Sequence, residues 1–128
     1  MRADSELAVL TKAKNLISYV FVVSETAPKK YRFSLLAKMQ NLSLDILESL
    51  ILANEVLLGH SAVENEKRLQ LQHDALAKLK VLDAVCLIAR VRVCVTPRQY
   101  TVLSELIADC CNMTGAWIHS DRKRSGGG

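Results

Sequence analysis

One stretch near the C-terminus, residues 96–119, constrains the fold more than any other part of the chain. Pro97 follows Thr96, and Gln99 stands three residues after Thr96. Threonine and glutamine at this spacing cap a helix start reciprocally, and proline fits the first helical position. Apolar residues then recur at spacings of three and four, at Leu103, Leu106, Cys110, Met113 and Trp117. The pattern predicts an amphipathic helix with this stripe in the core, and Gly115 is expected to let a neighbouring helix approach closely.

The composition indicates one all-α domain. The chain has 128 residues, which is enough to bury a core, and half of them are hydrophobic. Leucine and alanine dominate the apolar residues, and two prolines and five glycines leave few helix breaks. No uncharged stretch reaches the ~18 residues that a membrane span needs. The early acidic residues Asp4 and Glu6 are not typical of a signal peptide, so we expect a cytoplasmic protein.

Apolar periodicity predicts three further helices, over residues 5–24, 31–58 and 63–92. The stretch from Leu16 to Val23 is also β-prone, but an isolated strand would have no partner, so we interpret it as helix. Gly59 is expected to end the second helix as a left-handed cap. These elements predict an antiparallel up-down-up-down four-helix bundle over residues 1–120, followed by a basic, glycine-rich flexible tail at 121–128.

The first helix carries two neighbouring apolar stripes. We expect Leu7, Leu10, Ile17, Phe21 and Ser24 to share one face. The second stripe widens that face and consists of Leu16, Val20 and Val23.

The second helix has more apolar surface than a monomeric bundle can bury. Its polar residues fall on one narrow stripe, formed by Lys38, Asn41, Asp45, Glu48 and Glu55. The rest of its circumference is apolar, whereas the inner face of a bundle needs a stripe of little more than 100°. On the third helix, a further apolar strip consists of Val81, Val85 and Ile88. Because large exposed apolar patches are rare on soluble monomers, we predict a homo-oligomer.

The positive charges are clustered, although the formal net charge is only +4. One cluster lies between the first two helices and consists of Lys29, Lys30 and Arg32. A second lies around the connection of the last two helices and consists of Arg90, Arg92 and Arg98. The third follows the last helix and consists of Arg122, Lys123 and Arg124. In the predicted topology the first two clusters share one end. These residues, with Lys78 and Lys80, are the candidate nucleic-acid-binding residues. The alternative is that basic residues near helix C-termini complement the helix dipole and keep the surface soluble.

No catalytic, metal or cofactor site is expected. The sequence has no P-loop, no glycine-rich loop before a helix, and no Glu-x-x-His pair typical of a di-iron bundle. His73 beside Asp74 is interpreted as part of a solvated helix face. The four cysteines form no CxxC pair and are interpreted as buried free thiols in a reducing compartment.

Two stretches of the second half resemble a known family. The shared residues are Asp74, Ala75, Leu76, Ala77 and Leu79, then Thr96, Pro97, Gln99, Leu106, Ile107, Ala108, Gly115, Trp117, Ile118, Arg122 and Lys123. Together with the order of helices, they resemble the accessory variability determinant (Avd) proteins of diversity-generating retroelements. The wider family of four-helix bundles includes the 23S rRNA intervening-sequence proteins. The first half corresponds in its helix lengths and in a basic turn near Pro28.

The resemblance implies a homopentamer of four-helix bundles with a basic surface and no catalytic activity. The implied partners are a reverse transcriptase and template RNA or an RNA/DNA hybrid, and the implied function is support of mutagenic cDNA synthesis and retrohoming. Two alternatives stay open: an intervening-sequence type of protein with a role linked to ribosomal RNA, and a purely structural oligomer. Asp83 follows Lys78 and Lys80 on the third helix, so we expect weaker nucleic-acid contacts there.

Overall fold

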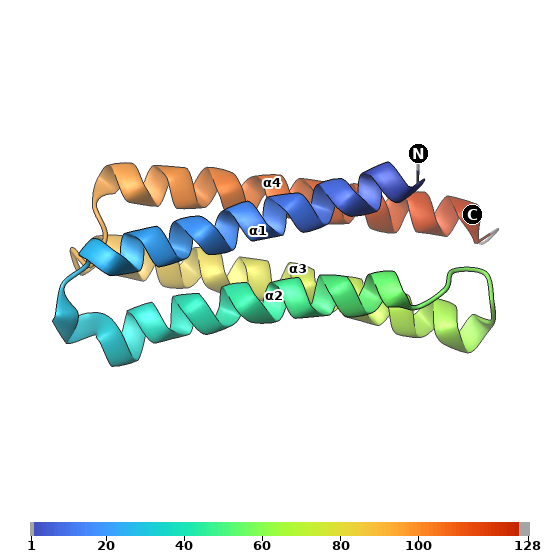
Figure 1. Cartoon of the computed structure of the whole chain (residues 1–128), viewed down its shortest axis with the longest axis horizontal. Helices are drawn as coiled ribbons and strands as arrows, with labels where there is room; N and C mark the ends of the chain where they lie inside the picture. The colour runs from blue at the N-terminus through green and yellow to red at the C-terminus, as the bar shows by residue number, and fades with distance from the viewer. Residues whose placement is uncertain (1, 126–128) are drawn as a thin grey trace.

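The computed structural model describes the backbone of residues 2–125 and the side chains of residues 8–125. Four long helices make up most of this range: α1 (Arg2–Thr26), α2 (Ala37–Glu55), α3 (Ala62–Val91) and α4 (Pro97–Arg124). They pack lengthwise as a four-helix bundle, in which α1 and α3 each contact both α2 and α4 (Figure 1). Residues 2–125 contain no strand, so the predicted all-α class and the helical bundle are confirmed.

The connections between helices lie in two groups. The α1–α2 and α3–α4 connections lie at one end of the bundle, and the α2–α3 connection lies at the other, with the start of α1 and the end of α4 (Figure 1). Two hydrogen bonds join the α1–α2 and α3–α4 parts of the chain at the end where these two connections lie. The Tyr31 hydroxyl donates to the Arg92 carbonyl at 2.9 Å, and the Gln99 side-chain amide donates to the Thr26 hydroxyl at 3.5 Å. Residues far apart in the sequence therefore meet at this end.

Helix α1 buries only part of the expected face. Its core side chains are Val9, Ala13, Leu16, Val20 and Val23. Leu16, Val20 and Val23, which were expected to widen the face, are buried, whereas Leu10 and Ile17 are half-buried and Phe21 is exposed. Leu7 lies outside the described side chains. The buried stripe belongs to the core, and α1 contacts both α2 and α4.

Helix α2 begins later than expected. A 3₁₀ turn (Lys29–Tyr31) and a π-helical turn (Arg32–Leu36) come before it, so the prediction of a regular helix from residue 31 is wrong at its start. A π turn holds more residues than an α turn and shifts the positions of the side chains. Here Leu36 is buried, whereas Arg32 and Phe33 are exposed.

Helix α2 also ends earlier than expected, at Glu55. Val56 is extended (φ −84°, ψ 123°), and its carbonyl accepts from Arg68 Nη1 at 2.9 Å. Gly59 has the expected left-handed backbone (φ 84°), but it lies in the α2–α3 connection, where its N–H donates to Asn65 Oδ1 at 2.7 Å. The prediction that Gly59 caps this helix is therefore wrong. The Arg68 side chain of α3 donates to the Val56 carbonyl at the helix end instead.

Helix α3 ends in a Schellman motif that lacks glycine. The Cys94 N–H donates to the Ala89 carbonyl at 2.8 Å, and the Val93 N–H donates to the Arg90 carbonyl at 3.0 Å. Val93 takes the left-handed position (φ 60°), which a β-branched residue rarely adopts. Cys94 and Ala89 are both buried and supply the hydrophobic contact that accompanies this motif. Packing thus holds a strained turn at this end of the bundle.

Helix α4 starts as predicted. Thr96 Oγ1 accepts from the Gln99 N–H, Gln99 Oε1 accepts from the Thr96 N–H, both at 3.0 Å, and Pro97 is the first helical residue. The predicted stripe faces inward: Leu103, Cys110 and Trp117 are buried, and Leu106 and Met113 are half-buried.

The middle and end of α4 differ from the prediction. A Cβ at Gly115 would meet no atom within 4 Å, so the expected close approach of a neighbouring helix is wrong. The helix runs on to Arg124, past the expected boundary at residue 120. Residues 126–128 of the expected tail lie outside the described residues.

The outer faces of α2 and α3 expose apolar side chains. On α2 the polar stripe is exposed as expected, and Leu44, Ile51 and Leu52 beside it are exposed and line a surface pocket of about 380 Å³. The exposed apolar side chains of α3 include Val81, Leu87, Ile88 and Val91. None of the helices in the described part is long and apolar enough to span a membrane.

Candidate nucleic-acid interface

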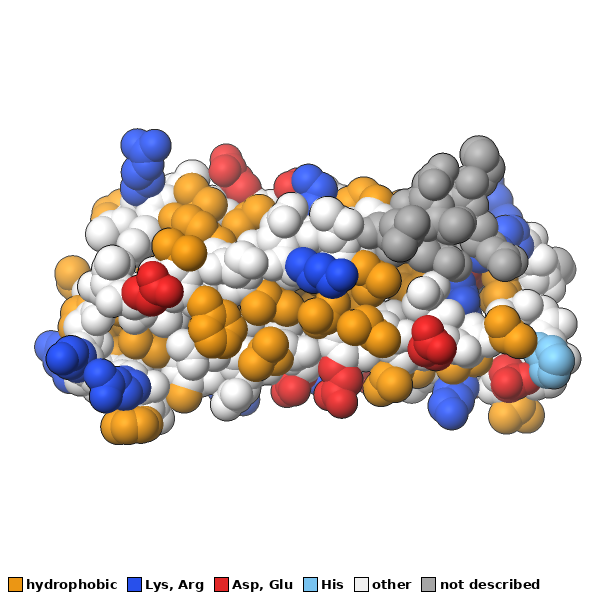
Figure 2. Space-filling model, in the orientation of Figure 1, with side chains coloured by type: hydrophobic (Ala, Val, Ile, Leu, Met, Phe, Trp, Pro, Cys, Tyr) orange, Lys and Arg blue, Asp and Glu red, His pale blue; other side chains and the backbone are white. Residues whose placement is uncertain are grey.

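Basic side chains gather at the end formed by the α1–α2 and α3–α4 connections, which we call the basic end. They are Lys29, Lys30, Arg32, Arg90, Arg92 and Arg98, and each of them is exposed. Figure 2 shows lysine and arginine side chains at this end, with hydrophobic side chains beside them. The hydrogen bond from Tyr31 to Arg92 joins the two connections directly, so the two predicted clusters meet on one surface.

Aromatic rings support some of these cations. Lys30 Nζ lies 5.2 Å from the centre of the Tyr31 ring. Arg90 Cζ lies 5.7 Å from the centre of the Tyr100 ring. Both distances allow cation–π attraction, which is worth about 0.5–1 kcal/mol at exposed sites. The contacts restrain the side chains and leave their charges at the surface.

The charges of the basic end are not neutralised locally. Among the described residues, none of these lysines and arginines forms an ion pair with a carboxylate. Glu25 shares a surface pocket of about 380 Å³ with Lys29 and Arg32 but makes no ion pair with either. The basic end therefore carries a positive potential that is available to an anionic partner.

Complementation of the helix dipole does not explain all of these cations. Arg98 lies in the first turn of α4, and Lys29, Lys30 and Arg32 lie in the 3₁₀ and π turns between α1 and α2. The start of a helix carries partial positive charge, so a cation there is unfavourable. Complementation of the helix dipole does account for Arg90 and Arg92, at the end of α3.

The other predicted candidates lie away from the basic end. Lys78 is half-buried on α3, and its Nζ donates to Ser49 Oγ of α2 at 3.2 Å. Lys80 is exposed further along the same helix. The cluster at residues 122–124 lies in the last turn of α4, at the opposite end, where Arg124 pairs with Asp121. The predicted residues therefore do not form one continuous surface.

The comparison with known protein families covers all four helices. The model of the bAvd-like family matches residues 7–121. The chain belongs to the bAvd-like family. Searches of curated proteins and of solved structures gave no match. The predicted resemblance to Avd proteins is thus confirmed at the level of the family.

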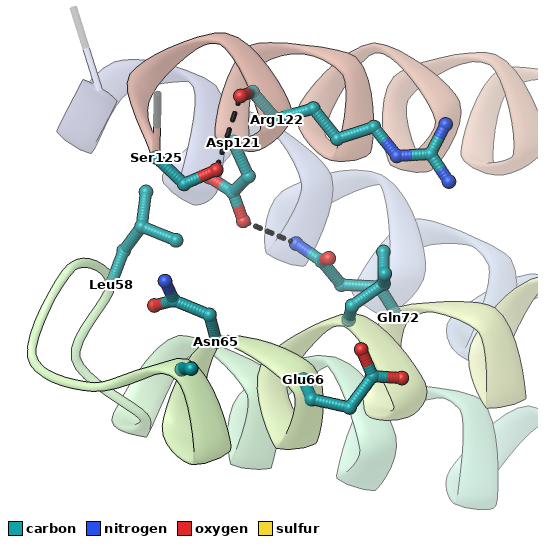
Figure 3. A pocket seen from close by; sticks show the side chains of 9 residues that line it. Leu58, Asn65, Glu66, Gln72, Asp121, Arg122 and Ser125 are labelled. Carbon is teal, nitrogen blue, oxygen red and sulfur yellow. Dashed lines mark hydrogen bonds between the residues drawn. The ribbon is translucent and has the colours of Figure 1, made fainter. Parts of the chain in front are cut away.

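This bAvd-like chain also contains a buried charge cluster that the sequence reasoning missed. Arg68 of α3 and Asp121 of α4 are only 4% and 5% exposed. Arg68 Nε lies 2.7 Å from Asp121 Oδ2, and Arg68 Nη2 lies 3.2 Å from Oδ1. Gln72 Nε2 donates to the same carboxylate at 2.8 Å (Figure 3). The cluster lies at the end opposite the basic end, beside a pocket of about 250 Å³.

The sequence does contain a signal for this cluster. Arg68 and Gln72 continue, at spacings of three and four, the inward stripe that includes Ala75. Asp121 follows the buried Trp117 by four residues. Opposite charges on two inward stripes at the same end of a bundle indicate a buried ion pair. The pair ties α4 to α3, and the bond from Arg68 to the Val56 carbonyl described above extends the tie to α2.

The cysteines offer little reactive thiol. Burial, with a smaller contribution from Asp83, raises the pKa of Cys86 to about 12. Burial is also the main cause that raises the pKa of Cys110 to about 12. Both thiols therefore stay protonated near neutral pH, where the thiolate is the reactive form. Within the described side chains, no three His, Cys, Asp or Glu residues gather as they would for a metal ion.

Proposed function

We propose that this bAvd-like protein is a non-catalytic accessory protein of a diversity-generating retroelement. In this role it binds template RNA or an RNA/DNA hybrid through the basic end, associates with the reverse transcriptase, and supports mutagenic cDNA synthesis in the cytoplasm. The observation that carries the proposal is the set of exposed cations at one end, none of which forms an ion pair with a carboxylate among the described residues. Membership of the bAvd-like family supports the choice of partners.

The proposed contacts are to the phosphate backbone. Lysine and arginine that neutralise phosphates release counterions, so affinity falls with salt by a slope of about 0.7 per phosphate for single strands and 0.9 for duplex. Arginine binds phosphate bidentately, and Arg92 lies in a turn that the Tyr31 hydroxyl holds in place. Such contacts carry no sequence information, so binding should extend over many RNA sequences.

We also propose that the protein forms a homo-oligomer, and the resemblance to Avd favours a pentamer. The exposed apolar side chains of α2 and α3, including Leu52 and Ile88, supply surface for contacts between subunits. Sedimentation equilibrium at micromolar concentration should give a multiple of the monomer mass. A monomer mass under those conditions would contradict self-association.

The test of nucleic-acid binding is a pair of matched double variants. Changing Arg92 and Arg98 together to Ala should weaken binding to single-stranded RNA and flatten the salt slope by about one to two units. Both side chains are exposed, so helical content and oligomer mass should not change. Changing Lys78 and Lys80 to Ala is the control, and it should have a smaller effect because Lys78 is held by Ser49.

The outcomes separate the alternatives. An unchanged slope in the arginine variant, with a collapsed slope in the lysine variant, would move the site to the side of the bundle. No binding of RNA by the wild-type protein at low salt, with or without the reverse transcriptase, would favour the purely structural oligomer.

A further inference from the structure

Phe33 is an aromatic side chain left in water at the basic end. It lies in the π-helical turn before α2 and is 89% exposed, more than any other large hydrophobic side chain of the described residues. Its neighbour Arg32 places Cζ 5.9 Å from the centre of the ring. The other rings of this end, Tyr31 and Tyr100, are half-buried, so the Phe33 ring is the most accessible of the three.

Exposed apolar side chains alternate with cations on both connections of the basic end. On the first connection Phe33 follows Arg32, and on the second the order is Arg90, Val91, Arg92, Val93, with both valines exposed. A partner that covers this surface must present negative charges and flat apolar faces at short intervals. Single-stranded nucleic acid does so, because phosphates and unpaired bases alternate along it. A duplex offers the phosphates to the cations but not the base faces to Phe33, because its bases are stacked inside.

We infer that Phe33 is a stacking platform for an unpaired base of a single-stranded nucleic acid bound at the basic end. The inference rests on the proposed nucleic-acid function and adds the residue and the type of strand. Arginine beside the ring supplies a phosphate contact and a cation–π contact at the same position. The Tyr31 hydroxyl, bonded to the Arg92 carbonyl, holds the first turn of this segment against the opposite connection. The ring is therefore presented from an anchored segment.

The test measures fluorescence anisotropy of a labelled single-stranded RNA of mixed sequence over a range of salt concentrations. Phe33→Ala should lower the affinity about 5- to 150-fold, the equivalent of one lost base–aromatic stack. Phe33→Leu should lower it similarly, because leucine is apolar but has no ring. Phe33→Trp should keep the affinity, and its indole emission should be quenched on binding. Because Phe33 is exposed, these variants should fold normally.

The salt dependence separates stacking from charge. Phe33→Ala should leave the salt slope unchanged, since it removes no charge, whereas the Arg92 and Arg98 double variant flattens it. When the same RNA is annealed to its complement, Phe33→Ala should bind it with the affinity of the wild-type protein. Val63→Ala is the control, because Val63 is also highly exposed but lies at the start of α3, at the opposite end.

Four outcomes would overturn the inference. If Phe33→Ala bound the single strand as tightly as the wild-type protein, stacking would be ruled out. The proposed function would stand as long as the salt slope still depended on the arginines. Wild-type affinity of Phe33→Leu would mean that an apolar contact suffices, as for a protein partner. If Phe33→Ala lost binding to vesicles of phosphatidylcholine and phosphatidylserine but kept its binding to RNA, the partner would be a membrane. Failure of the wild-type protein to bind any RNA would remove the proposed function first and this inference with it.

Discussion

The buried ion pair of Arg68 and Asp121 gives a sharp test of what holds the bundle together. The Asp121 carboxylate accepts from Arg68 Nε and Nη2 at 2.7 and 3.2 Å, and from Gln72 Nε2 at 2.8 Å. Asp121→Ala removes the acceptor of these three bonds, and of the Arg124 pair, at a site that is almost closed to water. Removing one partner of a buried pair costs about 3–5 kcal/mol of folding stability.

We expect a loss near the lower limit, about 3 kcal/mol. Arg68 keeps its hydrogen bond to the Val56 carbonyl at 2.9 Å and its contact with the Trp117 ring at 5.0 Å, so the buried guanidinium is still partly stabilised. A chain of this length has a total stability of roughly 6–19 kcal/mol. The variant should therefore still fold, with a melting temperature lower by roughly 10 °C.

The assay is urea unfolding followed by circular dichroism at one fixed protein concentration, because the stability of an oligomer depends on concentration. Asp109→Ala is the matched control, since it removes another carboxylate of α4. The Lys12–Asp109 pair is 3.6 Å long with side chains 39% and 49% exposed, so its loss should cost less than about 1 kcal/mol. Asp121→Asn, which keeps one acceptor oxygen, should fall between the two. Equal losses for Asp121→Ala and Asp109→Ala would refute the reasoning.

Three further predictions concern the core and the α3–α4 connection. Trp117→Ala should cost about 3–5 kcal/mol in the same urea assay, because the ring is buried and packs against Arg68; a loss below about 1 kcal/mol would contradict its core position. Val93→Gly should stabilise by about 1 kcal/mol in thermal unfolding, because glycine removes left-handed strain from an exposed side chain; a lower melting temperature would contradict the strain. Stability should fall as pH rises from about 9 toward 12, because the unfolded thiols of Cys86 and Cys110 ionise before the buried ones with their pKa of about 12. Cys86→Ala should make this decline in stability shallower. An identical decline in the variant would contradict the explanation by thiol ionisation.

Local sequence signals predicted the parts of the fold that depend on neighbouring residues. The start of α4 is set by Thr96, Pro97 and Gln99, which contact one another within one turn. The meeting of the two basic clusters followed from helix order and short connections. These features need no knowledge of which face of each helix packs against the others.

Features that depend on tertiary contacts could not be predicted in the same way. On α1, packing against α2 and α4 buries Leu16, Val20 and Val23 together with Val9 and Ala13, and leaves Phe21 exposed. The end of α2 is set by Arg68, a residue of the following helix. The left-handed turn after α3 holds Val93, where local propensity would call for glycine. In the candidate site, the exposure of Phe33 comes from the π turn, which leaves no periodic signal in the sequence.

The most direct test of the proposed function is cDNA synthesis by the purified reverse transcriptase of the same retroelement on its template RNA. The reaction is run without this protein, with the wild-type protein, and with the Arg92→Ala, Arg98→Ala variant. We predict that wild-type protein raises the yield of mutagenic cDNA and that the variant, equally helical and of the same oligomer mass, raises it much less. An equal yield in all three reactions would contradict the proposal that the protein acts with the polymerase through its basic end.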